Sequence, residues 1–129
     1  MRLDVPLVLA AGDPRFPVRL GTIPDPPERL YAVGNPAVLV LPGIAVIGTR
    51  SPSAYGESMG ARLTRIVAEA GYCIVSGLAA GCDTVAHTAA VRLGTPTVAI
   101  LPGGTDRIFP PENLGLARGI AESGGVLLS

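Results

Sequence analysis

Three short segments of the chain combine glycine, hydroxyl side chains and arginine in a way that suits an anionic ligand. The first covers residues 48–52, with the sequence Gly-Thr-Arg-Ser-Pro. Gly48 lets a ligand come close to the backbone, while Thr49 and Ser51 offer hydroxyl groups. Arg50 carries a planar guanidinium group that can form paired hydrogen bonds with an oxyanion. The types and spacing of these residues predict a phosphate contact.

The second segment covers residues 76–81, Ser-Gly-Leu-Ala-Ala-Gly, and leads directly into a predicted helix. Its two glycines leave backbone N–H groups accessible, and the positive end of the helix dipole adds to their attraction for an anion. We expect the ligand to contact this turn at Ser76, Gly77, Leu78, Ala79 and Gly81. The spacing of the two glycines differs from G-x-G-x-x-G, so the common dinucleotide-binding fingerprint is absent.

The third segment covers residues 102–107, Pro-Gly-Gly-Thr-Asp-Arg, and again joins glycines to an arginine. Its candidate contacts are Gly103, Gly104 and Arg107. Just beyond it, Phe109 carries an aromatic ring that can stack on a base, and Tyr55 offers the same chemistry near the first segment. For both rings, packing within the protein is the alternative role.

Each segment also has a purely structural interpretation. A single glycine turn is an ordinary connection between a strand and a helix, so the prediction depends on three such turns occurring together. Arg50 has an alternative partner in a carboxylate, at Asp83 or Asp106. Asp83 and His87 lie four residues apart on one helical face, and we interpret them as structural support for the second segment. A catalytic role would need a nucleophile, for which Ser76 is the only candidate, so we predict no catalytic residue and no enzymatic activity.

The composition limits the chemistry further. All ten basic residues are arginines, so the chain lacks the lysine that Schiff-base chemistry and the Walker A phosphate clamp require. Cys73, Cys82 and His87 are too few ligands for a zinc finger or ribbon, and we interpret both cysteines as small apolar residues. We predict no metal and no cofactor. The formal net charge is +0, which excludes a broadly basic surface, so any nucleic-acid binding must be local.

The three segments are positioned by strands and helices that alternate along the chain. Continuous apolar runs predict strands at residues 44–47, 72–76, 97–101 and 126–128, and periodic apolar positions predict helices at residues 54–70, 83–93 and 112–123. The predicted apolar face of the first helix consists of Met59, Leu63, Ile66, Val67 and Ala70. This alternation is typical of an α/β fold with a doubly wound, mainly parallel sheet and helices on both faces. Ligands of such sheets bind at the carboxyl ends of the strands, which is where the three segments lie.

The first 41 residues differ from the rest of the chain. Prolines are dense at residues 13–17 and 23–27, which predicts an extended lead-in packed on the domain, with a short strand at residues 30–33. We therefore divide the chain into a Pro-rich lead-in, residues 1–41, and an α/β domain, residues 42–129. Residues 1–12 show no convincing cleavage site of a signal peptide, and no apolar run reaches the ~18 residues of a membrane span. These features favour a cytoplasmic protein with reduced thiols and no membrane association.

Several of these motifs, in this order, resemble the DNA-processing protein A (DprA/Smf) family. They are the run from Ile44 to Arg50, Tyr55-Gly56, the run from Ser76 to Asp83, Ala86-His87, residues 109–113 and Leu127-Leu128-Ser129. In the lead-in, Asp25-x-Pro27 and Leu30-Tyr31 followed by Gly34 also match the family's approach to its first Rossmann strand. The resemblance covers residues 16–129.

The resemblance implies a Rossmann-like fold that binds single-stranded DNA. Members of the family protect incoming DNA during natural transformation and load the RecA recombinase onto it. Carried over by position, Gly48 and Arg50 belong to the phosphate-binding pocket. Its second wall is formed by Ser76, Gly77 and Gly81, and the third loop near the DNA by Gly103, Gly104 and Phe109. Single-stranded DNA is thus the expected partner, with RecA and a second copy in a homodimer as further candidates.

Some features depart from the family pattern. Cys82 stands where the family usually has isoleucine, and the lack of lysine reduces the positive charge around the pocket. Family members also continue beyond the position of Ser129, through further strands and often a small helical domain. On the resemblance, we expect the domain at residues 42–129 to be incomplete at its C-terminal end. Parts of the family's dimer and RecA-contacting surfaces lie in that further portion.

Two other functions compete with DNA binding. Nucleotide phosphoribohydrolases of the LOG-like family share the broad fold and resemble the chain at Ser76-Gly77 and at residues 102–104. In that family Pro-Gly-Gly is followed by Gly-Thr and a downstream catalytic glutamate. Here it is followed by Thr-Asp-Arg, and the glutamate has no counterpart at that spacing. The second alternative is a sensor that binds a small nucleotide at the same loops.

Overall fold

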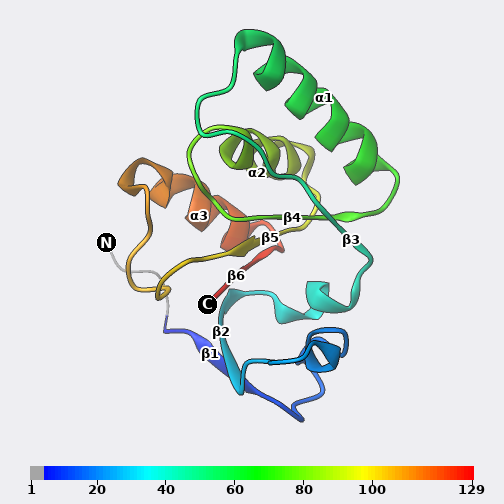
Figure 1. The fold of residues 1–129 in the computed structure, drawn as a ribbon, viewed down its shortest axis with the longest axis vertical. Helices are drawn as coiled ribbons and strands as arrows, with labels where there is room; N and C mark the ends of the chain where they lie inside the picture. Colours follow the sequence, from blue (N-terminus) through cyan, green and yellow to red (C-terminus); the bar gives the residue numbers. More distant parts are fainter. Residues whose placement is uncertain (1–4) are drawn as a thin grey trace.

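The computed structural model describes residues 5–129, which form one mixed sheet of six strands with three α-helices (Figure 1). The strands are β1 (Leu7–Ala10), β2 (Arg29–Gly34), β3 (Gly43–Ala45), β4 (Cys73–Ser76), β5 (Thr97–Ile100) and β6 (Val126–Leu128). Their order across the sheet is β1-β2-β6-β5-β4-β3. Residues 1–4, which belong to the predicted lead-in and to the segment inspected for a signal peptide, lie outside the described residues.

The strands from β3 to β6 pair in parallel, each with the next along the chain. This confirms the α/β, Rossmann-like fold and the single parallel sheet predicted from the apolar runs. Strands covered on both faces read as continuous apolar sequence because side chains of both orientations are buried. In the register, Val75 lies opposite Val98, and Ala99 lies opposite Leu127.

The α-helices are α1 (Ala54–Glu69), α2 (Cys82–Leu93) and α3 (Leu114–Glu122). Ser53 caps α1, because its Oγ accepts a hydrogen bond from the N–H of Gly56 at 3.0 Å. Gly71, with φ of 96°, follows the last turn of α1 as predicted. The third α-helix begins two residues later than predicted because Pro111–Asn113 form a short 3-10 helix, η3.

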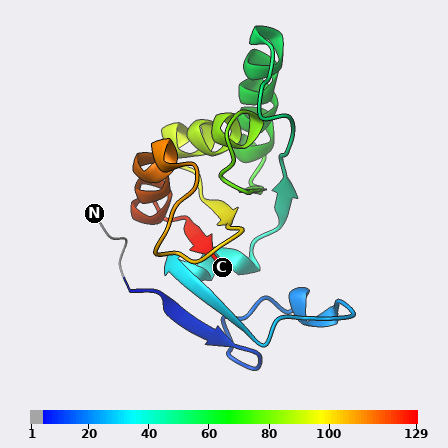
Figure 2. The ribbon, with the colours of Figure 1, turned by 60° about the vertical axis from the view of Figure 1, so that its left-hand side comes forward.

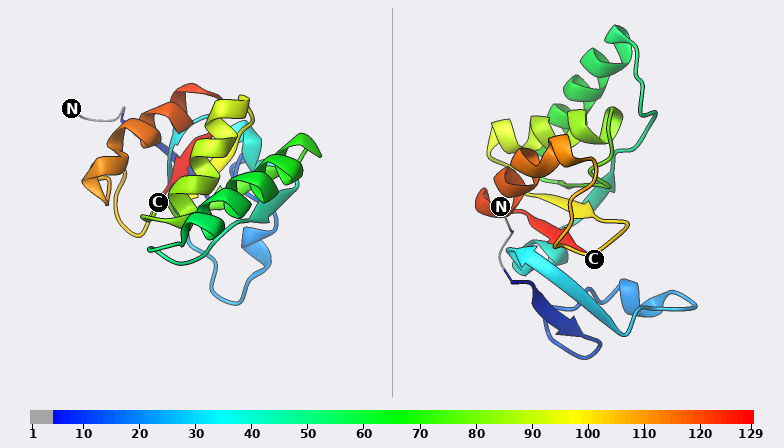
Figure 3. Two further views of the ribbon diagram at one scale, coloured as in Figure 1. Left: turned by 90° about the horizontal axis from the view of Figure 1, so that it is seen from above. Right: turned by 90° about the vertical axis from the view of Figure 1, so that its left-hand side faces the viewer.

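All three α-helices lie on the same face of the sheet, which corrects the expectation of helices on both faces (Figure 3). Ala99 and Leu127 pack against Ala117 and Ile120 of α3, and Ile74, on the same face, packs beside α1 and α2. The reason is the strand order. Each new parallel strand is added on the same side of the previous one, and a right-handed connection then returns its helix to the same face every time.

The opposite face is covered by the N-terminal segment (Figure 2). Phe16 and Val38 pack there against Val98 and Val126. The short 3-10 helices η1 (Leu20–Thr22) and η2 (Pro36–Val40) belong to this segment. The strand expected at residues 30–33 is part of β2, which pairs antiparallel with β1 and with β6. The Pro-rich segment therefore adds two strands to the sheet rather than only wrapping around it.

The face of α1 that was predicted to be buried is largely exposed. Leu63 and Ile66 retain 53% and 54% of their accessible surface, whereas Thr64 and Ala68 are buried. The helix packs mainly against α2 and less extensively against β4. The periodicity of α1 correctly predicted a helix with an apolar stripe, but not which side of it faces the sheet.

Candidate nucleic-acid interface

The three predicted loops meet at one edge of the sheet, where β3, β4 and β5 end. The first two are in direct contact, because the N–H of Cys82 donates a hydrogen bond to the carbonyl oxygen of Thr49 at 3.0 Å. A Cβ atom added to Gly81 would lie 2.6 Å from the carbonyl carbon of Arg50. Gly81 has φ of +85°, a conformation that side chains other than glycine rarely adopt. Gly81 is therefore needed both for the turn and for the close approach of the first loop.

Gly48 allows the same close approach from the other side. A Cβ atom on Gly48 would lie 2.7 Å from Sγ of Cys82 and 2.9 Å from its Cβ. The first loop is stabilised locally by Thr49, whose Oγ1 accepts a hydrogen bond from the N–H of Ser51 at 3.1 Å. The start of α2 and the loop after β3 thus form a tightly packed pair.

The backbone of the second loop is already hydrogen-bonded within the protein. Oδ2 of Asp83 accepts hydrogen bonds from the N–H groups of Gly77 and Ala79, at 3.1 and 3.4 Å. Nε2 of His87 accepts a hydrogen bond from the N–H of Leu78 at 3.2 Å. These three N–H groups, expected from the sequence to face the ligand, are satisfied from inside. These hydrogen bonds fix the shape of the loop, and the three N–H groups are not available to bind an anion.

His87 is buried and neutral. Burial lowers its pKa from 6.5 to about 4, while the charge of Asp83 acts in the opposite direction. Its Nδ1 lies 2.8 Å from Oγ1 of Thr97, which itself donates a hydrogen bond to the carbonyl oxygen of Ile74 at 2.8 Å. Since Nε2 accepts from Leu78, Nδ1 carries the proton and donates to Thr97. Through these contacts His87 links the second loop, at Leu78, to β5, at Thr97, as expected for a residue that supports this loop.

The hydroxyl group of Ser76 is also used within the fold. Its Oγ donates a hydrogen bond to the carbonyl oxygen of Val46 at 2.6 Å and the residue is buried, so Ser76 ties β4 to the residues after β3. Both ring nitrogens of His87 are likewise bonded elsewhere, to Leu78 and Thr97, so Ser76 and His87 do not form a hydrogen-bonded pair.

Several polar groups at this edge remain available to a ligand. Within residues 5–129, the N–H groups of Thr49, Arg50, Ala80 and Gly81 donate no hydrogen bond. The side chain of Arg50 is exposed and forms no ion pair in that range, so the alternative pairing with Asp83 or Asp106 is not observed. Unpaired donors therefore lie on both sides of the contact between the first loop and the start of α2.

The third loop is the most open of the three. Gly103 has no atom within 4 Å of an added Cβ, Arg107 is exposed and Phe109 retains 68% of its accessible surface. Ile108 is buried under the loop and anchors it to α3 and β6. The loop thus presents a cationic and an aromatic side chain beside the other two.

Asn113 connects the third loop to the second, a role not predicted from the sequence. Its Nδ2 donates hydrogen bonds to the carbonyl oxygen of Leu78 and to Oγ1 of Thr84, each at 2.9 Å. Thr84 in turn donates to the carbonyl oxygen of Ala79 at 2.7 Å. Asn113 stands at the N-cap position of α3 but makes no capping hydrogen bond, so its local position gave no signal of these long-range contacts.

The environment of Cys73 does not favour a reactive thiol. Burial raises the pKa of Cys73 to about 11, and its thiol lies 3.5 Å from the carbonyl oxygen of Pro96. In the part of the chain that the structure describes, no cluster of histidine, cysteine and carboxylate side chains could hold a metal ion. The same residues include no helix that is long and apolar enough to cross a membrane.

Comparisons with known proteins identify the family of the chain. Residues 7–129 match the family model of DNA recombination-mediator protein A. The chain belongs to this family. It is 37% identical over 126 residues to protein Smf of Synechocystis and 38% identical over 109 residues to the DNA processing protein DprA of Bacillus subtilis. These matches cover 95% and 84% of the chain but 32% and 37% of the relatives, so the chain spans about a third of their length.

Solved structures of the family share the fold. The DNA processing protein A of Streptococcus pneumoniae superposes with a TM-score of 0.83 at 34% identity, over 95% of this chain and 43% of that protein. The Helicobacter pylori protein, whose structure was described for its single-stranded DNA binding mode, gives a TM-score of 0.85 at 33% identity, over 100% of this chain and 57% of that protein. Both superpositions cover nearly the whole of this chain and therefore show that its overall fold is shared.

Proposed function

We propose that this domain of the recombination-mediator family binds single-stranded DNA where its first loop meets the start of α2. The observation that carries the proposal is the exposed, unpaired Arg50 next to the free N–H groups of Ala80 and Gly81. A guanidinium fork and backbone N–H groups at a helix N-terminus are the donors that bind phosphate oxygens. The likeness to the Helicobacter pylori protein supports single-stranded DNA as the polymer to which the phosphates belong.

The residues of the interface divide into two groups. Thr49, Arg50, Ser51 and Gly81 are proposed to contact the phosphates, and Gly48 allows the backbone to approach. Gly103, Gly104, Arg107 and Phe109 are proposed to form an outer wall, in which Phe109 stacks on a base. Ser76, Gly77, Leu78 and Ala79, with Asp83 and His87 beneath them, are proposed to hold the pocket in shape.

The wider role is proposed for the whole protein, because the chain spans about a third of its curated relatives. It comprises protection of incoming DNA during natural transformation, loading of RecA and homodimer formation, in the cytoplasm. Catalysis is not part of the proposal. Ser76 and His87 are bonded within the fold, which does not favour a hydrolase of the LOG-like kind.

The test is the binding of a fluorescently labelled oligo(dT) of about 20 nucleotides, followed by anisotropy, with a duplex of the same length as the comparison. We expect the single strand to bind more tightly than the duplex, and adenosine monophosphate not to displace it. Displacement by the mononucleotide would indicate the small-nucleotide sensor, and release of free adenine would indicate the hydrolase. Equal affinity for both DNA forms would also contradict the proposal.

A further inference from the structure

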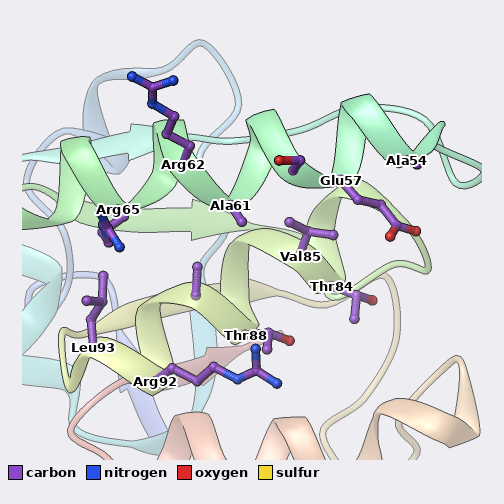
Figure 4. Close-up of a pocket in the computed structure, with 12 residues that line it drawn as sticks. Ala54, Glu57, Ala61, Arg62, Arg65, Thr84, Val85, Thr88, Arg92 and Leu93 are labelled. Carbon is purple, nitrogen blue, oxygen red and sulfur yellow. The ribbon is translucent and has the colours of Figure 1, made fainter.

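A second surface, outside the three loops, lies between α1 and α2 on the side facing away from the sheet (Figure 4). The groove has a volume of about 820 Å³ and runs from the N-terminal ends of both helices towards their C-terminal ends. Ala54 and Thr84 line its beginning, and Arg65 and Leu93 line its end. It is large enough for a row of side chains from a partner.

The floor of the groove is apolar and made of small side chains. Ala61 of α1 and Val85 and Ala89 of α2 leave a depression between the two helices, and Val85 lies between them in Figure 4. Leu93 extends the apolar surface to the far end and is 37% exposed. A floor of this kind accepts the apolar stripe of a third helix, whose side chains fill the space between two packed helices.

The rim of the groove is positively charged. Arg62, Arg65 and Arg92 line it, which is three of the ten arginines of the chain. Glu57 is the only carboxylate in the lining and lies at the opposite end. The ion pair of Arg65 with Glu69, at 3.7 Å, is exposed and therefore weak, so Arg65 is available to another partner. In a chain of net charge +0 this is a local concentration of positive charge.

We propose that this groove binds an acidic amphipathic helix of another protein. Apolar side chains of that helix, spaced at i, i+3 or i+4 and i+7, cover Ala61, Val85 and Ala89, and its flanking carboxylates pair with the arginine forks. Because Glu57 lies at the end away from Arg65 and Arg92, the acidic residues gather over the C-terminal ends of α1 and α2. The helix is thereby held in one direction.

A nucleic-acid strand fits the groove less well than such a helix. Single-stranded DNA binds on surfaces where bases stack on aromatic rings, and none of the residues that line the groove is aromatic. Exposed rings outside the lining include Tyr55, in the first turn of α1, Tyr72, just after α1, and Phe109, beside the loops. The aliphatic floor between arginines thus favours a peptide over a phosphodiester chain.

The test uses a displayed library of peptide helices about 18 residues long, with acidic and apolar positions randomised, selected on the 129-residue protein without DNA. We expect the selected helices to carry carboxylates beside an apolar stripe. Arg65→Glu combined with Arg92→Glu should weaken their binding at least tenfold, and Arg65→Gln with Arg92→Gln should weaken it less. Arg19→Glu, on the opposite face of the sheet, should change it less than twofold. Circular dichroism confirms that each variant is folded.

Two results would overturn the proposal. One is a selection that enriches no acidic helix, or helices whose affinity does not depend on Arg65 and Arg92. The other is a parallel loss of oligo(dT) affinity in the Arg65→Glu/Arg92→Glu variant, which would make the groove a path for nucleic acid. Since the peptides are measured without DNA, the proposal fails or stands independently of DNA binding at the loops.

Discussion

Nε2 of His87 accepts a hydrogen bond from the backbone N–H of Leu78 at 3.2 Å, and this contact fixes the only described non-glycine residue with a positive φ. Leu78 has φ of 60°, its side chain is fully buried and its carbonyl oxygen accepts a hydrogen bond from Asn113. A leucine holds this conformation only where its surroundings fix it on several sides. The loop after β4 is therefore a preorganised support for the residues that follow it, Ala80 and Gly81.

The buried histidine predicts a loss of stability in mild acid. The pKa of His87 is about 4 in the folded chain and 6.5 in the unfolded one, so protons bind the unfolded state first as the pH falls. Its contribution is fully present above pH 6.5 and is lost as the pH falls towards 4. Between pH 7 and pH 5 the free energy of unfolding should decrease by about 2 kcal/mol, measured by urea denaturation. In His87→Gln the free energy of unfolding should not show this decrease. If the variant shows the same decrease between pH 7 and pH 5 as the unmodified chain, groups other than His87 cause it.

Gly81→Ala should destabilise the fold by more than about 2 kcal/mol, because it combines a forbidden backbone conformation with a collision against Arg50. Gly103→Ala is the matched control, since Gly103 has open space around it and no positive φ. It should change the free energy of unfolding by less than about 0.5 kcal/mol. Thermal or urea unfolding of both variants measures the difference, and similar values for the two would contradict the packing described for the first loop.

Asn113→Ala removes the two hydrogen bonds to Leu78 and Thr84 and leaves a buried carbonyl oxygen without its partner. We expect a cost of about 1–3 kcal/mol and faster hydrogen exchange of the amides in residues 77–81. Asn35→Ala is the control, because Asn35 is exposed and accepts a single hydrogen bond, from Ala37. If exchange in residues 77–81 is as slow as in the unmodified chain, Asn113 does not hold the second loop.

Because the apolar stripe of α1 is exposed, replacing its side chains should cost little stability, whereas its periodicity had indicated a buried face. Leu63→Gln together with Ile66→Gln should cost less than about 1 kcal/mol, because both side chains are already about half exposed. Ile120→Ala, at a fully buried position, should cost about 2–5 kcal/mol. Urea denaturation at low protein concentration compares them. A large cost for the double variant would mean that this stripe is buried in solution.

The positions of the strands and helices were predicted well because they are determined by neighbouring residues in the sequence. Continuous apolar runs specify strands that are covered on both faces, and Ser53 and Gly71 mark the ends of α1 through capping geometry. The face of the sheet that the helices cover depends instead on strand order, which no local pattern contains. The stripe of α1 was misassigned for a similar reason, since periodicity reports an apolar face but not its neighbour.

The candidate interface was predicted in part. That the glycine turns and Arg50 lie at one edge of the sheet could be predicted because each directly follows a predicted strand; their contact with a ligand stays a prediction. The sequence did not reveal that Gly77, Leu78 and Ala79 direct their N–H groups inward, because this depends on how Asp83 and His87 reach back from α2. Asn113 acts from 35 residues further along the chain than Leu78, a contact that only the fold creates.

The central claim is tested most directly by titrating labelled oligo(dT) with the unmodified protein, Arg50→Ala and Arg19→Ala at several salt concentrations. For a pocket that holds ~2–3 phosphates, the logarithm of the binding constant should fall against the logarithm of salt with a slope of roughly −2. Arg50→Ala should reduce that slope by a little under one unit and cost roughly 1.5–3 kcal/mol of binding free energy, while Arg19→Ala leaves both nearly unchanged. Equal losses in the two variants, or no binding by the unmodified chain, would contradict a phosphate pocket at Arg50.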